Sequence, residues 1–200
     1  DIQYILRRMA DGEFPSHYLY GATRLPDYGI GVVWHKARIG LPRWRMMLRN
    51  AWQVLTCREH FDAIYATHYR GLELIVLLRA LGLYRKPVII WHHQPIVTPR
   101  SKWREWLGRV FYRGFDRMFF FSQKLIDDSL HSPKARPGRM VLGHWGADLD
   151  FYDRVMDGGD GHRHGFVSTG KELRDMPTLV EAFNKAGADL DIYVGRDIGG

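Results

Sequence analysis

Short apolar runs alternate with helical patterns along most of this chain, and that alternation constrains the fold more than any other feature. The clearest run is KPVIIWHH, 86–93, in which apolar residues follow one another without a break. A continuous apolar run of this length is typical of a strand buried on both faces, and such strands belong to parallel sheets. Strands that alternate with helices predict an α/β fold, a Rossmann-like parallel sheet with helices on both faces.

The other elements of the first 150 residues follow from the same patterns. We expect strands over 28–36, 61–67, 86–93, 116–122 and 139–145. We expect helices over 2–9, 41–57, 72–81, 103–111 and 124–130. The helix 41–57 has one apolar face, made by Trp44, Leu48, Ala51 and Leu55.

The chain changes character at residue 153. The stretch DRVMDGGDGHRH, 153–164, is polar and rich in glycine, and we interpret it as a linker between a domain over 1–152 and a second one. Residues 165–200 then read as strand, helix and strand, the first β-α-β of a second, truncated Rossmann-like domain. Asp1 stands inside a helical pattern and Gly200 directly after a strand, so we expect a fragment of a longer protein.

The net charge is +7, and the basic residues are concentrated in two stretches. No acid lies between Asp27 and Glu59, and this interval is rich in lysine and arginine. The second stretch, 100–117, mixes arginines with tryptophan, phenylalanine and tyrosine. Basic residues beside exposed aromatics suit anionic lipid headgroups or nucleic acid. The alternative is a solvated basic face whose tryptophans belong to the core.

The cysteine count and the hydropathy of the chain indicate the cellular compartment that we expect for the protein. Cys57 is the only cysteine, so no disulfide can form within the chain and no cysteine-based zinc cluster is available. No apolar run reaches the roughly 18 residues that a membrane span needs. We therefore expect a cytoplasmic protein, and the basic stretches are compatible with peripheral contact to the inner face of the plasma membrane.

Four segments, in this order, carry a resemblance to a known family: PVIIWHHQP, FDRMFFFSQKLIDDSL, VLGHWGADLDFYD and GFVSTGKELRDMPTLVEAF. Together they resemble the retaining glycosyltransferases of the GT-B fold called family 4 or "group 1" glycosyltransferases. The resemblance covers nearly the whole chain. It implies two Rossmann-like domains facing each other across a cleft, the first for the acceptor and the second for the nucleotide-sugar donor.

The resemblance also implies an activity. Such an enzyme, of hexosyltransferase type, moves a sugar from a nucleotide-sugar to a saccharide or lipid-linked acceptor in surface polysaccharide or glycan synthesis. The family's first strand would precede Asp1 and its paired glutamates would follow Gly200, so we expect the fragment alone to be inactive. The nucleotide-sugar is a substrate and we expect no cofactor. We also expect no metal, because no D-x-D motif stands where one would be needed.

His92 and His93 are the candidate catalytic residues, because the family's histidine in this loop contacts the donor sugar or the acceptor. A neutral imidazole can accept or donate a hydrogen bond to a hydroxyl near neutral pH. Adjacent residues at a strand end face opposite ways, and we favour His93, which lies nearer the turn. The alternative is a histidine satisfied by backbone groups. A zinc site would need His68 or another distant ligand, and no metal-ligand spacing supports it.

Gly170, Lys171 and Arg174 are the candidate residues for binding the donor diphosphate. A pair of cations would neutralise the charge that grows on the departing diphosphate. The family has the arginine first and the lysine a few residues later, whereas this chain exchanges the two and shortens the loop. The alternative is a solvated basic turn.

Ser122, Gly146 and Asp148 are candidates for a cleft or structural role. Asp148 closes the first domain in the family's pattern, and we favour a capping role for it. We also favour a helix cap over a ligand contact for Ser122. His144 is a lone histidine in a strand and fits a core position.

Two other functions compete with the transferase. A lone Rossmann-like domain could be a non-catalytic module that binds an anionic ligand or partner, but such a module does not need the second β-α-β. Charge alone suggests nucleic-acid binding, but the chain has no recognition motif, and we expect no nucleic acid as a partner.

Overall fold

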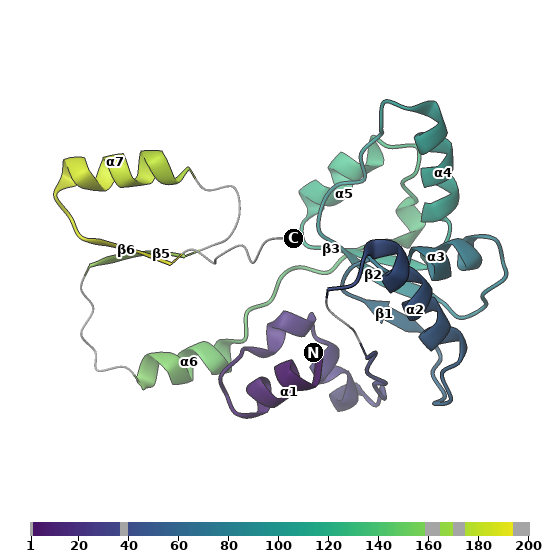
Figure 1. Cartoon of the computed structure of the whole chain (residues 1–200), viewed down its shortest axis with the longest axis horizontal. Helices are drawn as coiled ribbons and strands as arrows, with labels where there is room; N and C mark the ends of the chain where they lie inside the picture. Colours follow the sequence, from purple (N-terminus) through teal and green to yellow (C-terminus); the bar gives the residue numbers. More distant parts are fainter. Residues whose placement is uncertain (1, 37–39, 159–164, 170–174, 194–200) are drawn as a thin grey trace. The chain divides into compact units, whose positions relative to one another are not determined.

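The computed structural model describes residues 2–36, 40–158, 165–169 and 175–193 (Figure 1). The chain divides into two compact units, Asp1–Asp153 and Arg154–Gly200, and each is described by itself.

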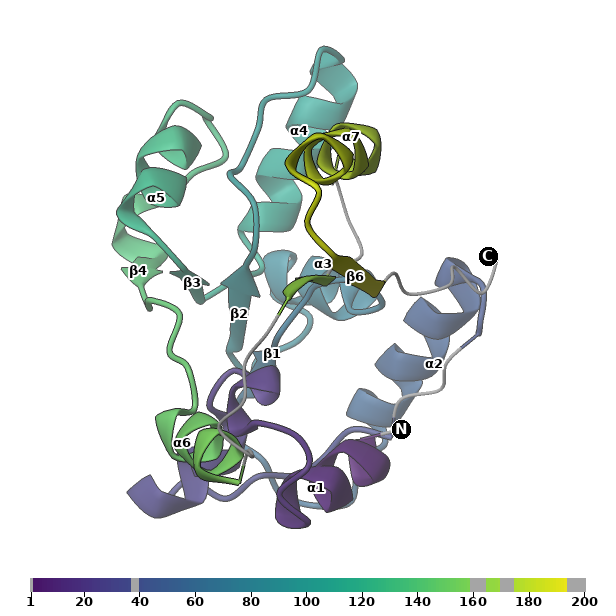
Figure 2. The same ribbon diagram turned by 90° about the vertical axis from the view of Figure 1, so that its left-hand side faces the viewer.

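The first unit is built on a parallel sheet of four strands. They are β1 (Ile64–Ala66), β2 (Val88–His92), β3 (Arg117–Phe120) and β4 (Met140–Leu142). They lie side by side in the order β1-β2-β3-β4, as Figure 2 shows. The register pairs Ile90 with Ala66 on one side and with Met118 on the other. The predicted α/β fold with a parallel sheet is therefore confirmed.

A helix joins each strand of this sheet to the next. The joining helices are α3 (Glu73–Ala80), α4 (Lys102–Tyr112) and α5 (Gln123–Leu130). The other helical segments of the unit are α1 (Ile2–Ala10), η1 (Ser16–Leu19), η2 (Ala22–Tyr28), α2 (Arg43–Leu55) and η3 (Pro137–Arg139). A further helix, α6 (Leu149–Asp157), crosses the boundary between the units. The helices expected over 2–9, 41–57, 72–81, 103–111 and 124–130 all form.

The core lies on one face of the sheet. Side chains alternate along a strand, so Val88 and Ile90 point to the same face of β2, and both are fully buried. Met118 and Phe120 of β3 share that face and are fully buried as well. The cluster that these side chains form includes Ile75, Val76 and Phe115 from α3 and from the turn after α4. This burial is the main force that holds the three joining helices to the sheet.

The opposite face is only half-buried and is rich in aromatic rings. Trp91 stacks on Phe119 and on Phe121, with ring centroids 5.3 Å and 4.9 Å apart. Tyr20, which follows η1, contacts the ring of Trp91 from outside the sheet. We predicted helices on both faces, but within the described residues the three helices that join the strands belong to the buried core on the other side. Helices covering both faces of the sheet are therefore not shown.

The carboxylate of Asp116 ties the amino ends of the strands together. It accepts hydrogen bonds from Nη2 and Nε of Arg79 at 2.7 Å and 3.0 Å, and from the backbone N–H of Val88 at 2.9 Å. Burial alone would raise the pKa of Asp116, but these bonds and the charges of Arg79 and Arg139 outweigh it and leave the pKa below its usual value. One carboxylate thus links α3, β2 and β3.

The strand expected over 28–36 does not form. Tyr28 is the last residue of η2, Gly29 ends that helix with φ of 74°, and residues 30–36 pair with no strand of the described part of the chain. Tyr28, Ile30 and Val33 are exposed. The sequence pattern of this segment is typical of a strand. A strand also requires a neighbouring strand for its backbone hydrogen bonds, and a local pattern does not reveal whether one is present.

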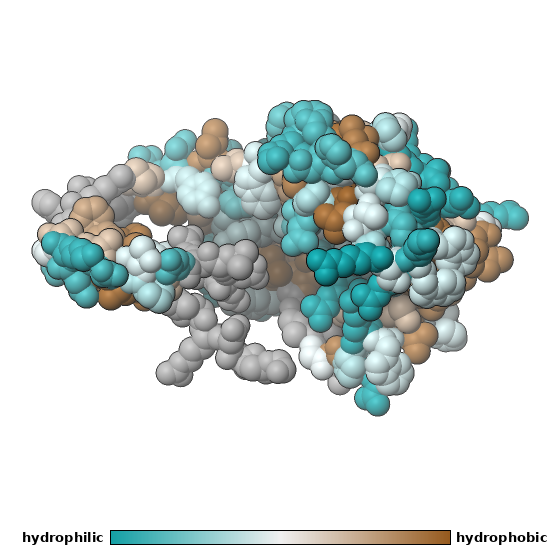
Figure 3. Space-filling view, turned by 90° about the horizontal axis from the view of Figure 1, so that it is seen from above, coloured by the Kyte–Doolittle hydropathy of each residue, from teal (hydrophilic) through white to brown (hydrophobic). Residues whose placement is uncertain are grey.

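Helix α2 forms as expected but buries a different side. Asn50 and Ala51 are its buried residues, and the Asn50 side chain donates a hydrogen bond to the carbonyl of Gly71, which precedes α3. Gly71 has no room for a larger side chain, because an added Cβ would lie 2.8 Å from Nδ2 of Asn50. The rest of the expected apolar face is exposed to solvent, namely Trp44, Leu48 and Leu55. On the face of the molecule drawn in Figure 3, hydrophobic residues lie scattered among hydrophilic ones.

The second unit contains the expected β-α-β. Its strands β5 (Phe166–Thr169) and β6 (Leu190–Tyr193) are parallel and α7 (Met176–Ala186) lies between them in sequence. Asp175 caps α7 by accepting the N–H of Thr178 at 3.1 Å. The linker expected over 153–164 begins inside α6, so its first residues are helical rather than irregular.

Gly114 sits where α3 and the end of α4 touch, and it provides a test of this packing. A Cβ at this position would lie 2.0 Å from the carbonyl oxygen of Val76, a backbone atom that cannot move alone. We expect Gly114→Ala to lower the free energy of unfolding by about 3 kcal/mol. Urea denaturation would measure the change. Gly138→Ala is the matched control, since a Cβ there meets nothing within 4 Å, and a similar loss in both variants would contradict the packing.

Candidate functional site

Rings gather at the carboxyl edge of the sheet. The strands β1, β2, β3 and β4 are followed within a few residues by His68, His93, Phe121 and Trp145. Because the strands are parallel, their carboxyl ends share one edge, where open α/β sheets bind ligands. The ring of Tyr20 joins them, with its centroid 5.4 Å from His93 and 5.3 Å from Trp145. We call Tyr20, His68, His93, Phe121 and Trp145 the carboxyl-edge cluster.

Tyr20 is held in place through its backbone. The hydroxyl of Tyr65 donates a hydrogen bond to the carbonyl of Tyr20 and accepts one from Nε1 of Trp91 at 2.5 Å. Tyr20 has φ of 52°, in the left-handed region that residues other than glycine seldom occupy. Tyr20 is the residue that ends η1, and its backbone N–H donates to the carbonyl of His17, which accounts for this conformation.

His93 is the exposed histidine of the predicted pair. Its Nε2 lies 2.7 Å from the carbonyl of Thr67, and since a carbonyl can only accept, Nε2 carries the proton. Nδ1 is then a hydrogen-bond acceptor, and it has no partner within the described residues. The ring contacts those of Tyr20 and Phe121, at centroid distances of 5.4 Å and 5.2 Å, and these two rings also contact each other at 5.9 Å. His93 therefore presents one oriented acceptor at the edge.

His92 is buried and both of its ring nitrogens are engaged. Nδ1 lies 2.8 Å from the carbonyl of Gln94 and so carries the proton, and Nε2 accepts from the hydroxyl of Tyr112 at 3.0 Å. The ring stacks on Phe120 with centroids 5.2 Å apart. Burial lowers the pKa of His92, and the positive charge of a protonated His93 or His68 would lower it further, although the bond to Gln94 opposes this. These contacts favour the structural alternative for His92.

His68 is a residue of this edge that we had considered only as an unsupported zinc ligand. Its Nδ1 accepts the backbone N–H of Arg70 at 2.9 Å, and its ring centroid lies 5.8 Å from that of His93. Burial lowers the pKa of His68, and the neighbouring His93 and Arg70 lower it further. The sequence could have pointed to His68, because it directly follows the expected strand 61–67 just as His93 ends the expected strand 86–93.

Ser122 stands at the start of α5 as its N-cap. Its Oγ accepts the backbone N–H of Leu125 at 3.3 Å. The hydroxyl therefore satisfies one of the helix's first N–H groups, which is the role that we favoured for it.

Asp148 connects the end of the first unit to η1. Oδ2 accepts the backbone N–H of Ser16 at 2.8 Å, and Oδ1 accepts that of Phe151 at 3.2 Å. The backbone N–H of Asp148 donates to Nδ1 of His17 at 3.3 Å. These bonds hold η1, and the Tyr20 that follows it, beside the sheet. Gly146 is exposed, and a Cβ there would meet nothing within 4 Å, so packing does not explain this glycine.

His144 does not occupy the core position that we expected. It is exposed, lies beyond the end of β4 and has φ of 45°, again in the left-handed region. It separates Gly143 from Trp145, and Gly143 has no space for a larger side chain because an added Cβ would lie 2.6 Å from the indole of Trp91.

The candidate donor-binding residues Gly170, Lys171 and Arg174 lie outside the described residues. Their role therefore stays a prediction.

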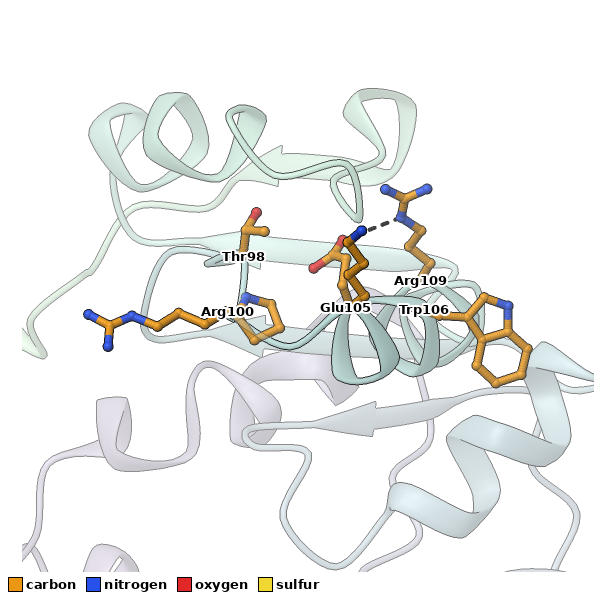
Figure 4. A pocket seen from close by; sticks show the side chains of 7 residues that line it. Thr98, Arg100, Glu105, Trp106 and Arg109 are labelled. Atoms are coloured by element: carbon orange, nitrogen blue, oxygen red, sulfur yellow. Dashed lines mark hydrogen bonds and ion pairs between the residues drawn. The ribbon is translucent and has the colours of Figure 1, made fainter.

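A pocket of about 300 Å³ lies where the loop that follows β2 enters α4, and its lining residues are not those of the carboxyl-edge cluster (Figure 4). Glu105 is buried beside it and bonds to Nζ of Lys134 at 3.0 Å and to Nε of Arg109 at 3.3 Å. Arg100 and Arg109 extend away from each other in Figure 4, so these two arginines do not converge on one point. The buried carboxylate is already paired, and we assign no ligand here.

Comparison with known proteins does not assign the chain to a family. No protein-family model matches the chain, and no curated protein is significantly similar to it. Among the described residues no group of three or more histidine, cysteine, aspartate or glutamate side chains could hold a metal ion. The helices in the described ranges are all too short or too polar to cross a membrane.

The buried His92 makes stability depend on pH. Its pKa in the folded chain is below the value of about 6.5 that it has when unfolded, so the unfolded chain binds more protons between these two pKa values. Stability is therefore fully present above about pH 6.5 and falls as the pH drops towards the folded pKa. We expect His92→Gln to flatten this slope in urea titrations at several pH values. His60→Gln, at an exposed side chain, should leave it unchanged, and an unaltered slope in His92→Gln would contradict this assignment.

Proposed function

We propose that this chain belongs to a glycosyltransferase of the GT-B type, which moves a sugar from a nucleotide-sugar to a saccharide or lipid-linked acceptor. The observation that supports it most is the exposed acceptor nitrogen of His93 among rings at the carboxyl edge of a parallel sheet. The order of the four resembling segments and the parallel β-α-β of the second unit agree with this proposal.

The carboxyl-edge cluster suits a sugar by its chemistry. A sugar ring has apolar C–H faces and a rim of hydroxyl groups, so aromatic faces and a hydrogen-bond acceptor complement it. Trp145 is half exposed and Tyr20 lies beside it. Nδ1 of His93 would accept a hydrogen bond from a hydroxyl of the donor sugar or of the acceptor, and so orient it.

The reaction breaks the bond between the anomeric carbon and the diphosphate, and forms a bond from that carbon to an acceptor oxygen, whose proton is released. Negative charge grows on the departing diphosphate. In the proposal Lys171 and Arg174 neutralise that charge, and Gly170 lets the backbone approach the phosphates. No metal and no cofactor take part in the proposed step.

Replacing His93 tests this proposal. We expect His93→Ala to lower kcat about a hundredfold in the protein that carries this chain, because one positioning contact to a reacting hydroxyl is lost. The assay is transfer of labelled sugar from a panel of nucleotide-sugars to lipid and saccharide acceptors. His60→Ala is the control, at an exposed and remote histidine. Binding of a nucleotide-sugar without any transfer would favour the non-catalytic module instead.

We further propose that α2 holds the enzyme against an anionic membrane, where lipid-linked acceptors lie. Its exposed stripe consists of Trp44, Leu48, Trp52 and Leu55, and the two tryptophans are 57% and 69% exposed. Tryptophan favours the membrane interface, and arginine favours anionic headgroups. The guanidinium of Arg45 lies over the ring of Trp44, 5.0 Å from its centroid, so charge and apolar surface adjoin. On α4, the exposed rings of Trp103 and Trp106 stack 5.0 Å apart among further arginines.

Vesicle flotation tests the membrane contact. We expect the double change Trp44→Ser with Trp52→Ser to weaken binding to phosphatidylglycerol vesicles at least about tenfold. Arg45 is the best arginine for a charge reversal, Arg45→Glu. A reversal at Arg43 or Arg49 would also break a contact within the fold, since Arg43 bonds to Glu73 and Arg49 to the carbonyl of Lys36. Leu83→Ser, at another exposed apolar residue, is the control. Equal flotation of all these variants would exclude α2 as the contact.

A further inference from the structure

A second concavity lies at the amino end of the sheet, opposite the carboxyl-edge cluster. Its volume is about 440 Å³, and charged side chains dominate its lining: Arg79, Arg113, Asp116, Arg136 and Arg139. They come from the end of α3, from the turn between α4 and β3, and from the segment that leads through η3 to β4. We call these five residues the arginine pocket.

Two of the four arginines have structural partners. Arg79 forms the paired hydrogen bonds to Asp116, which neutralise the only carboxylate of the pocket lining. Arg139 donates from Nη1 to the carbonyls of Arg113 and Phe115, at 2.9 Å and 2.7 Å, and so satisfies backbone groups at the end of α4. These contacts fix both guanidinium groups in position.

The other two arginines have no such explanation. The side chains of Arg113 and Arg136 make no hydrogen bond or ion pair within the described residues, and Nε and Nη2 of Arg139 are also without a partner there. Four guanidinium groups therefore face one carboxylate, and the pocket has three positive charges in excess. This excess of positive charge in the lining attracts an anion.

We infer that the arginine pocket binds a phosphate group, either of a soluble phosphorylated compound or of a lipid headgroup. Guanidinium groups present planar pairs of N–H donors that match the oxygens of phosphate. Asp116 is already paired with Arg79, so it does not repel the anion as an unpaired carboxylate would. The pocket lies at the opposite end of the strands from His93, so it is independent of the proposed transfer site.

Calorimetric titration of the full chain with inorganic pyrophosphate tests the site. We expect Arg113→Glu and Arg136→Glu each to weaken binding at least about tenfold, because each change replaces a cation with an anion. The affinity should also fall as NaCl rises from about 50 mM to about 500 mM. Since neither side chain has a partner within the described residues, both variants should keep the thermal unfolding midpoint of the parent.

Arg104→Glu is the matched control, an exposed arginine of α4 outside this pocket. Absence of pyrophosphate binding by the parent, or an equal loss in Arg104→Glu, would overturn the inference. Vesicles with phosphatidic acid, added to the chain that carries the Trp44→Ser and Trp52→Ser changes, distinguish the two sources. Competition with pyrophosphate assigns the site to a lipid headgroup, and lack of competition assigns it to a soluble phosphate.

Discussion

The carboxyl edge of the sheet depends on the contacts of the buried His92 ring. His92 ends β2 inside the core, bonds to the turn through Gln94 and to α4 through Tyr112, and stacks on Phe120 of the next strand. Because His92 points inward, His93 must point to the other face, where Thr67 orients its ring. A buried histidine satisfied by one carbonyl and one hydroxyl thus positions an exposed histidine that has an acceptor nitrogen to offer.

The two ends of the sheet have opposite chemistry. The carboxyl edge gathers histidines and aromatic rings, which suit a neutral, hydroxyl-rich ligand. The amino end gathers arginines around Asp116, which suit a phosphate. The same buried strands, β2 and β3, connect these ends, so a ligand at one end and a ligand at the other would bind one rigid core.

The sequence was most informative where local pattern decides the structure. Continuous apolar runs predicted β2 and β3, and helical spacing predicted α2, α3 and α4, because burial of one face stabilises each of them wherever the neighbours lie. The strand expected over 28–36 failed because a strand needs a partner. The apolar face of α2 was misjudged because the helix packs through Asn50, Ala51 and Val54, and the hydrogen bond from Asn50 to Gly71 fixes that side against the core.

The site was predictable only in part, because some of its residues are positioned by contacts between distant segments of the chain. The position of His93 follows from the strand that precedes it, and His68 follows from the same rule. The contribution of Tyr20 could not be predicted, because it depends on Tyr65, 45 residues away in sequence, and on the bond between Asp148 and η1. Such contacts between distant segments leave no periodic signal in the sequence.

The central claim is that a sugar binds at the carboxyl edge. Nuclear magnetic resonance can locate it through the ring signals of the histidines and the indole signals of the tryptophans, recorded while an acceptor saccharide or a nucleotide-sugar is added. The account predicts shifts for His93 and Trp145 and none for His60. Unchanged signals at His93 and Trp145, with shifts confined to other rings, would contradict it.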